Sequence, residues 1–285
     1  MAPVWPNFFI VGAARAGTTS LYEYLRPIDK VYLSPVKEPR YFCAAAEPPG
    51  YAPPAIRSET EYLKLFSAVQ DQAAVGEASP QYLCDPGAPE AIHAAVPEAR
   101  IVMILRDPVE RAYSHYLLHQ RMGVQQRPAA TALKDDLYLR HGRYAGPVKN
   151  YRRLFGASRV KALIFDDFVR DTRGSVREVL RFLGIDAQPA STSEIHNAYG
   201  RPRGPLRRLI YQNMLLKTAG RRWFSDRLRR KAREEIFLGK DAKPPLPQEI
   251  RTFLEEFYRA DVLELEEILG CNLPWFHARA ARRAP

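Results

Sequence analysis

The feature that most constrains the fold is a short apolar run that ends in glycine and leads through a tight turn into a helix. The run Phe8-Phe9-Ile10-Val11-Gly12 has no polar residue, which predicts a strand buried on both faces of a parallel sheet. The following segment, Thr18 to Leu25, is expected to be helical, with Leu21 and Leu25 four residues apart. A buried strand that passes into a helix begins a βαβ unit, and such a unit needs further parallel strands.

Further strands and helices alternate along the chain and complete this pattern. Strands are predicted over Val31–Leu33, Ala74–Gly76, Ile101–Leu105 and Val160–Phe165. Helices are predicted over Glu61–Phe66, from Asp107 as N-cap onward, over Ser175–Leu183 and over Pro247–Leu269. The apolar side chains assigned to the core of the helical part are Leu180, Leu183, Leu263 and Leu269. The sequence therefore predicts an α/β fold with a parallel sheet and a helical C-terminal elaboration, as a single domain over 1–285.

Composition excludes several classes of protein. Hydrophobic residues make up 46% and charged residues 26% of the 285 residues, which excludes disorder of the whole chain. No apolar run approaches the ~20 residues of a membrane-spanning helix, and the segment Met1–Pro6 lacks the features of a signal peptide. Cys43, Cys84 and Cys271 lack the spacing of a zinc site or a disulfide framework. A cytoplasmic enzyme without a metal fits these observations best.

The positive charge is concentrated in one segment. Between Arg201 and Arg233 there are twelve Lys and Arg residues against one acid, Asp226, which equals the net charge of +11 of the whole chain. Apolar residues recur at helical spacing within this basic segment, which is predicted to be helical over 201–240. Such a segment suits an anionic membrane surface, an acidic carrier protein or an anionic glycan, and a helix packed on the body with a solvated basic face is the other interpretation. No specific nucleic acid is expected, and the tail 276–285 is expected to fray.

The turn after the first strand has the composition of an anion-binding loop. Gly12 and Gly17 are five residues apart, so backbone N–H groups can converge on an anion beside the N-terminus of the next helix. Arg15 adds a positive charge, and Thr18 and Thr19 add hydroxyl donors. Thr18 stands where loops that bind nucleoside triphosphates carry lysine. A glycine-rich turn without a ligand is the alternative, which these three side chains disfavour.

A second anion site is predicted at the end of the strand Ile101–Leu105. Arg106 can contact a phosphate with two nitrogens, and Ser114 lies seven residues beyond Asp107, on the same side of the helix. An ion pair of Arg106 with Asp107 is the alternative, and Glu110 and Arg111 are expected to be surface charges. Two anion sites on neighbouring strand ends suggest a nucleotide that carries phosphate at both ends.

Five segments together resemble a known family, the sulfotransferases that use 3′-phosphoadenosine-5′-phosphosulfate (PAPS), with the character of bacterial enzymes related to heparan sulfate and carbohydrate sulfotransferases. The segments are Pro6–Gly12 running into Ala16–Leu21; Ser34–Pro39; Gly76–Leu83; Leu105–Tyr116; and His196-Asn197 with Arg201 and Arg203 beyond. The resemblance covers most of the chain from Pro6 to Leu273, and it is the joint occurrence of the segments that is specific.

The resemblance implies a P-loop nucleotide-kinase-like fold, with a five-stranded parallel sheet flanked by helices, and a set of cofactor-binding residues. The loop would hold the 5′-phosphosulfate, Arg106 and Ser114 would hold the 3′-phosphate, and the segment Arg201–Gly204 would close over the same phosphate. The full set implied in this way is Arg15, Ala16, Gly17, Thr18, Thr19, Ser20, Arg106, Ser114, Tyr144, Arg201, Arg203 and Gly204. For Tyr144 a place in the core is the alternative.

The resemblance also implies the reaction, in which a sulfuryl group moves from PAPS to an acceptor hydroxyl and PAP (3′,5′-diphosphoadenosine) is released without a metal. Glu38 would be the general base, Lys37 would help to neutralise the sulfuryl group, and Arg15 would serve where the family usually has lysine. A solvated Lys37–Glu38 charge pair is the alternative. Glu77 and Ser79 would line the acceptor cleft or be structural, and most of the six histidines are expected to be surface or packing residues.

Two other functions stay open at this point. One is a phosphotransferase that uses ATP and magnesium, and the other is a non-catalytic basic protein that binds membranes or nucleic acid. For the sulfotransferase, the acceptor is expected to be a carbohydrate, a glycolipid or a specialised metabolite. The enzyme would be cytoplasmic, with peripheral binding to a membrane through the basic segment as an option.

Overall fold

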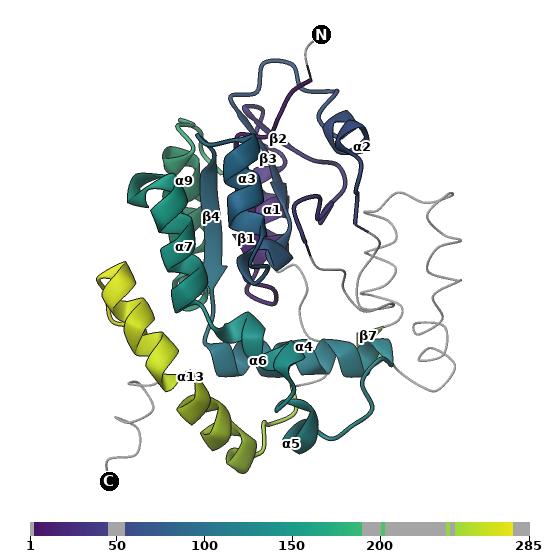
Figure 1. Ribbon diagram of the computed structural model, residues 1–285, viewed down its shortest axis with the longest axis vertical. Coiled ribbons are helices and arrows are strands. Elements are labelled where there is room, and N and C mark those ends of the chain that lie inside the picture. The colour runs from purple at the N-terminus through teal and green to yellow at the C-terminus, as the bar shows by residue number, and fades with distance from the viewer. Residues whose placement is uncertain (1–2, 45–54, 190–200, 203–237, 240–242, 276–285) are drawn as a thin grey trace.

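Five parallel strands form the central sheet of the computed structural model, which describes residues 3–44, 55–189, 201–202, 238–239 and 243–275 (Figure 1). The strands are β1 (Phe8–Gly12), β2 (Val31–Leu33), β3 (Ala74–Ala78), β4 (Arg100–Leu105) and β5 (Val160–Ile164). They lie in the order β2-β3-β1-β4-β5, and every pair is parallel. The predicted α/β fold with a five-stranded parallel sheet is confirmed, and the bounds predicted for β1 and β2 match the structure.

The helices form layers on both faces of the sheet, because parallel strands need crossover connections. The helix α1 (Thr18–Leu25) contacts β1, β2, β3 and α9 (Thr172–Phe182), while α3 (Ala88–Ala95) contacts α7 (Ala145–Phe155), which lies against β4 and β5 (Figure 1). The remaining short helices are α2 (Glu59–Lys64), η1 (Pro80–Leu83), α5 (Ala129–Ala132), α6 (Asp136–Leu139), η2 (Arg140–Gly142), η3 (Ala157–Arg159) and α8 (Phe165–Arg170).

Two longer helices extend beyond the sheet. The helix α4 (Pro108–Met122) follows β4 directly, with Asp107 as N-cap accepting hydrogen bonds from the backbone N–H groups of Val109 and Glu110. The helix α13 (Gln248–Leu269) packs along α7 and α4 at the lower left of Figure 1. This arrangement agrees with the predicted helical elaboration at the C-terminal side.

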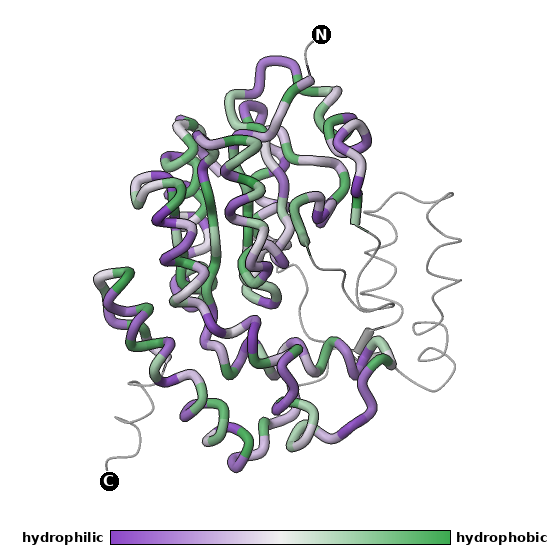
Figure 2. The backbone as a smooth tube through the Cα atoms, in the orientation of Figure 1, coloured by the Kyte–Doolittle hydropathy of each residue, from purple (hydrophilic) through white to green (hydrophobic). Residues whose placement is uncertain are grey.

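The helix α13 buries one stripe of side chains, and hydrophobic and hydrophilic stretches alternate along it in Figure 2. The buried stripe consists of Ile250, Leu254, Tyr258, Val262 and Leu265, at steps of three and four residues. The assignment of Leu263 to the core is wrong: it follows Val262 by about 100° around the helix and is 48% exposed.

Parts of the sequence-based interpretation lie outside the described residues. These parts are nearly all of the basic segment 201–240 and the tail 276–285. Within the basic segment, the backbones of β6 (Arg201–Pro202) and β7 (Leu238–Gly239) form a short antiparallel pair, with Arg201 opposite Gly239. In the described ranges, no helix combines the length and the apolar character needed to cross a membrane.

Gly76 allows β3 to pack beside the large ring of Phe8, its register partner on β1. A Cβ atom at Gly76 would lie 2.4 Å from Cε1 of Phe8, which is too close for any real contact. We expect Gly76→Ala to lower the free energy of unfolding by about 1–3 kcal/mol through overpacking, measured by urea denaturation. If this clash is the cause, Phe8→Leu combined with Gly76→Ala will cost less than the sum of the two single changes. Additive effects would contradict this explanation.

Candidate functional site

The phosphate-binding loop predicted between β1 and α1 lies at the carboxyl end of the sheet, where ligands of parallel α/β sheets bind. The backbone N–H of Ala13 donates to the carbonyl of Ile104 at 2.8 Å, which ties the start of the loop to β4. Gly17 is the N-cap of α1 with a φ of 92°, a conformation that favours glycine. Thr18 and Ser20 are buried in the first turn of α1, and Thr19 is half-buried. The loop therefore presents a helix N-terminus and its hydroxyl side chains at the ligand edge.

Gly12 also brings the loop close to the next element. A Cβ atom at Gly12 would lie 2.5 Å from Cβ of Leu83, so the helix η1 can approach the end of β1 only because residue 12 has no side chain. This close approach matters because η1 also carries Gln81, which contacts Glu38. The loop and the candidate base are therefore connected through one short helix.

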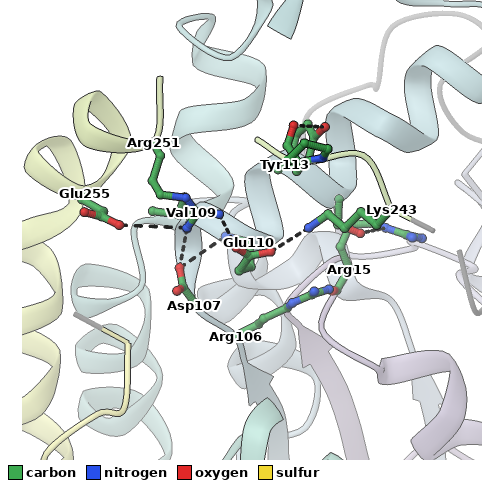
Figure 3. A network of polar contacts seen from close by, with 11 residues as sticks. Arg15, Arg106, Asp107, Val109, Glu110, Tyr113, Lys243, Arg251 and Glu255 are labelled. Carbon is green, nitrogen blue, oxygen red and sulfur yellow. Dashed lines mark hydrogen bonds and ion pairs between the residues drawn. The ribbon is translucent and has the colours of Figure 1, made fainter. Parts of the chain in front are cut away.

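The two predicted anion sites are brought into direct contact. The Nε of Arg15 donates to Oγ of Ser114 at 3.2 Å, and Nη1 of Arg106 donates to the carbonyl of Arg15 at 2.9 Å. Figure 3 shows the side chain of Arg106 reaching toward Arg15 above the end of the sheet. The guanidinium of Arg106 also lies over the ring of Phe165, with 4.5 Å from Cζ to the ring centroid. Arg15, Arg106 and Ser114 thus form one continuous surface with two guanidinium groups.

Tyr144 supports this surface from below. Its side chain is fully buried, and its hydroxyl donates to the backbone carbonyl of Arg106 at 3.0 Å. Its own N–H donates to Asp261 on α13 at 2.7 Å. Tyr144 therefore has the core environment given above as the alternative, and it lies directly beneath the end of β4.

Glu110 is not a simple surface charge, contrary to the sequence-based expectation. Its carboxylate accepts from Lys243 at 2.6 Å and from Arg251 at 2.8 Å, and its side chain is 26% exposed (Figure 3). Burial alone would raise the pKa of Glu110, but the hydrogen bonds and charges of Lys243 and Arg251 outweigh it and lower the pKa to about 2. The carboxylate therefore stays ionised and holds Lys243 beside α4.

Lys243 is a candidate site residue that the sequence interpretation missed. Its ammonium lies 4.7 Å from the centroid of the Tyr113 ring. Burial lowers the pKa of Lys243, with the positive charges of Arg106 and Arg251 acting in the same direction, while Glu110 opposes this. A signal for this contact is hard to find in the sequence, because Lys243 and Glu110 are 133 residues apart. Lys243 adds a third cation near the Arg106 surface.

Arg111 was expected to be a surface charge, and this prediction is wrong because its side chain is fully buried. It donates to the carbonyl of Tyr138 and contacts Nδ1 of His115 at 3.4 Å. His115, His119 and His141 form a cluster here, with ring centroids 4.2 Å apart for the first two and 5.3 Å for the first and third. These three are buried packing histidines, as expected for most of the histidines. A charged residue on the inner face of an amphipathic helix has no distinct sequence signature.

The carboxylate of Glu38 is fixed by hydrogen bonds and an ion pair at the same edge of the sheet. Its backbone N–H donates to the carbonyl of Ala78 at the end of β3, at 3.0 Å. One carboxylate oxygen pairs with Lys37 Nζ at 2.5 Å, and the other accepts from Gln81 Nε2 at 3.0 Å. Burial would raise the pKa of Glu38, but Lys37 and Gln81 outweigh it and hold the pKa below its usual value. The lowered pKa keeps the carboxylate ionised at neutral pH, and its side chain is 28% exposed to solvent.

Glu77 and Ser79 are both fully buried, and their hydrogen bonds are to other protein groups. These surroundings agree with the second interpretation given above, in which Glu77 and Ser79 are structural residues and do not line the acceptor cleft. Of the remaining predicted residues, Ala16 is buried in the loop, Arg201 is described as part of the backbone of β6, and Arg203 and Gly204 lie outside the described residues. Over the ranges that the structure describes, no three His, Cys, Asp or Glu side chains gather as a metal ion would require.

The comparison with known proteins shows the family of this chain. Residues 36–189, more than half of the chain, match the model of the Sulfotransferase family, a segment that includes Glu38, Arg106 and Ser114. The chain belongs to the sulfotransferase family. The predicted resemblance is thereby confirmed.

Three similar proteins illustrate how far the similarity extends. The chain is 29% identical over 191 residues to human heparan sulfate glucosamine 3-O-sulfotransferase 6, covering 64% of this chain and 53% of the relative. It is 29% identical to a sulfotransferase from Alicyclobacillus acidocaldarius of known structure, covering 98% and 100% of the two chains with a TM-score of 0.70. Mouse sulfotransferase SULT7A1, solved with PAP, is 14% identical, covers 90% of this chain and 84% of its own, and has a TM-score of 0.52, which indicates a shared fold. The chain spans about half the length of the human relative.

Proposed function

We propose that this sulfotransferase transfers the sulfuryl group of PAPS to an acceptor hydroxyl. The observation that carries the proposal is the contact of Arg15 with Ser114 and of Arg106 with the Arg15 carbonyl, because it joins two anion sites beside one helix N-terminus. A nucleotide with phosphate groups on both its 5′ and 3′ sides, such as PAPS, matches two such sites. Family membership and the structural neighbour solved with PAP support the same donor.

The residues of the loop would hold the 5′-phosphosulfate. The N–H groups of Gly17 to Ser20 at the N-terminus of α1, with the Thr18 and Thr19 hydroxyls, would bind this anion, and Arg15 would supply a fixed positive charge, whereas the N–H of Ala16 donates to the Ala13 carbonyl at 3.2 Å. Arg106 and Ser114 would hold the 3′-phosphate above Tyr144, and Arg201, Arg203 and Gly204 would close over it. Lys243, held beside Arg106 by Glu110, adds positive charge to this half of the site.

The transfer itself forms one bond and breaks another. The acceptor oxygen attacks sulfur in line with the bond from sulfur to the 5′-phosphate oxygen, and that bond breaks as the new S–O bond forms. The proton of the acceptor hydroxyl passes to the carboxylate of Glu38, and the electron pair of the broken bond stays on the phosphate of PAP. Lys37, whose ammonium pairs with Glu38 at 2.5 Å, would neutralise the moving sulfuryl group. The sulfate ester and PAP are the products, and no metal is required for this balance.

The acceptor is proposed to be a hydroxyl of a carbohydrate, a glycolipid or another small metabolite, since the human relative is named for a glycan substrate. Peripheral binding to an anionic membrane or an acidic carrier protein is proposed from the charge of residues 201–233 alone, and a cytoplasmic location stays a prediction.

Calorimetric titration of the full chain with PAP tests the nucleotide site. We expect PAP to bind without metal, and 5′-AMP to bind more weakly because it lacks the 3′-phosphate. Arg106→Ala should weaken PAP binding by about 10- to 100-fold, since hydrogen bonds to charged groups contribute about 1.5–3 kcal/mol. The same change should have a much smaller effect on 5′-AMP.

Arg159→Ala is a matched control, because Arg159 is exposed and pairs with Glu98 just before β4, at the opposite end of the strands. It should leave PAP binding unchanged. A preference for ATP with magnesium over PAP would instead support the phosphotransferase, and binding of anionic vesicles or nucleic acid without PAP binding would support the non-catalytic alternative. Either result would contradict the proposed activity.

A further inference from the structure

Glu77 is a buried carboxylate that accepts hydrogen bonds from three hydroxyl groups. It lies on β3 with no exposed surface. One carboxylate oxygen accepts from the hydroxyls of Tyr62 at 3.0 Å and Tyr82 at 2.7 Å, and the other accepts from the hydroxyl of Ser79 at 2.7 Å. A buried carboxylate costs folding free energy even when it is hydrogen-bonded, so this arrangement calls for an explanation beyond stability.

Two of these three hydroxyls connect Glu77 to the segment that follows Glu38. Ser79 Oγ accepts from the backbone N–H of Arg40 at 3.1 Å, and the Tyr82 hydroxyl accepts from the backbone N–H of Phe42 at 3.3 Å. The Tyr62 hydroxyl donates to Glu77, and in the part of the chain that the structure describes it accepts no backbone N–H from this segment. Glu77 thus reaches the base segment by two separate relays.

The charge of Glu77 sets the direction of both relays. An ionised carboxylate can only accept hydrogen bonds, so the single hydrogens of Ser79 and Tyr82 must point at Glu77. Each hydroxyl then presents a lone pair outward, which is what the N–H groups of Arg40 and Phe42 require. A neutral amide at position 77 could not impose this direction on both hydroxyls, because its NH₂ group would donate to one of them.

The segment held by these relays has an unfavourable backbone conformation at the candidate base. Glu38 has a φ of 63° and Arg40 a φ of 53°, in the left-handed region that costs non-glycine residues about 1 kcal/mol or more. The N–H of Glu38 is fixed to the Ala78 carbonyl on one side. The Arg40 and Phe42 anchors fix the other side, so the turn cannot relax and turn the carboxylate of Glu38 away from Lys37 and Gln81.

We propose that Glu77 is a positioning residue that fixes Glu38 in its catalytic orientation through the hydroxyls of Ser79 and Tyr82. The inference rests on the proposed function for the role of Glu38, and on the geometry of β3, η1 and the 37–42 segment for everything else. Burial raises the pKa of Glu77 to about 7, while the hydrogen bonds from Ser79, Tyr82 and Tyr62 oppose this rise. The ionised form that sets the relays is therefore accessible at neutral pH.

Amide hydrogen exchange of the full chain measures the two relays directly, with no acceptor required. Ser79→Ala should speed exchange of the Arg40 amide by about five- to tenfold, the usual effect of one lost hydrogen bond, and leave the Phe42 amide unchanged. Tyr82→Phe should do the reverse. Glu77→Gln should speed exchange of at least one of these two amides.

Tyr62→Phe is the matched control, because it also removes one hydrogen bond to Glu77 but lies on neither relay. It should leave both amides and the titration of Glu38 unchanged. The titration is followed by carbon NMR of the Glu38 carboxyl, assigned by its absence in Glu38→Gln. Ser79→Ala should move the pKa of Glu38 upward toward its usual value, since the contacts with Lys37 and Gln81 loosen.

These outcomes separate the inference from the proposed function. Equal exchange and equal Glu38 titration in Ser79→Ala and Tyr62→Phe would overturn the positioning role, whether or not PAP binds. Absence of PAP binding to the wild-type chain would overturn the proposed activity while the exchange pattern stayed as described. All four variants should bind PAP like the wild type if they fold, because none of the four residues belongs to the proposed nucleotide site.

Discussion

Replacement of Glu38 by glutamine is expected to lower turnover by about 10²- to 10⁴-fold, the usual contribution of a general base. The amide keeps the shape of the side chain but cannot take the proton of the acceptor hydroxyl. Binding of PAP should not change, because Glu38 follows β2 whereas the two anion sites follow β1 and β4. The measurement is transfer of radiolabelled sulfate from PAPS to an acceptor found by screening, with PAP affinity measured by calorimetry on the same preparations.

The matched control is Glu98→Gln, a glutamate whose side chain is 74% exposed just before β4 at the opposite end of the strands. It should keep full activity. Turnover by Glu38→Gln within a few fold of the wild type would exclude Glu38 as the base.

The charges around Glu38 also predict the pH profile of the reaction. Since Lys37 and Gln81 outweigh burial and lower the pKa of Glu38, the acidic fall of kcat/KM should occur below pH 4.5. Lys37→Met should move this fall to higher pH.

The positions of the strands and of the anion loop could be predicted because their signals are local. The run from Phe8 to Gly12 is apolar at every position and is buried at every position. The helix from Thr18 to Leu25 begins after a glycine with positive φ, and its observed bounds match the prediction. The approach of Arg106 and Ser114 to Arg15 followed from topology, since β1 and β4 are neighbours and their carboxyl ends meet. Each of these predictions needed only nearby residues and the rules of parallel sheets.

The rest of the site depends on contacts between distant residues, which local patterns do not encode. Lys243 reaches Glu110 across 133 residues, so both looked like ordinary charges in the sequence. Arg111 is buried because α4 turns its inner face toward α6 and η2, a packing that the helix sequence alone does not determine. Leu263 is a different case, because the spacing of Ile250, Leu254, Tyr258 and Val262 already placed it off the buried stripe. The exposure of Leu263 was therefore predictable from periodicity.

Acidification below pH 6.5 is expected to destabilise the fold through the histidine cluster beside Arg111. Burial, together with the positive charge of Arg111, lowers the pKa of His119 to about 4 and that of His141 to about 3, and it holds the pKa of His115 well below its usual value. In the unfolded chain these histidines titrate near 6.5. Between the folded and unfolded pKa values the unfolded state binds more protons, so stability falls as the pH falls. At pH 5 each histidine should cost about 2 kcal/mol relative to pH 7.

Glu77 acts in the opposite direction over nearly the same range. Because burial raises its folded pKa to about 7 from 4.5, the folded state binds more protons than the unfolded state between these values. Its contribution therefore improves as the pH falls from 7 to 4.5, by up to about 3 kcal/mol, and offsets part of the loss from the histidines. Glu77→Gln removes this compensation, so its stability should fall more steeply with acid than that of the wild type.

Urea denaturation at pH 7.5, 6.5 and 5.0 measures both effects. His141→Gln should flatten the acid dependence, because a neutral amide does not titrate, whereas His93→Gln should leave it unchanged. His93 is a suitable control because it packs edge-on against Phe155 at 5.2 Å, on α3 and away from Arg111. Equal stability of the Glu77→Gln variant at pH 7.5 and 5.0 would mean that the cluster is ionised in the folded state, against its burial and the charge of Arg111. That result would exclude the neutral histidine cluster as a determinant of acid stability.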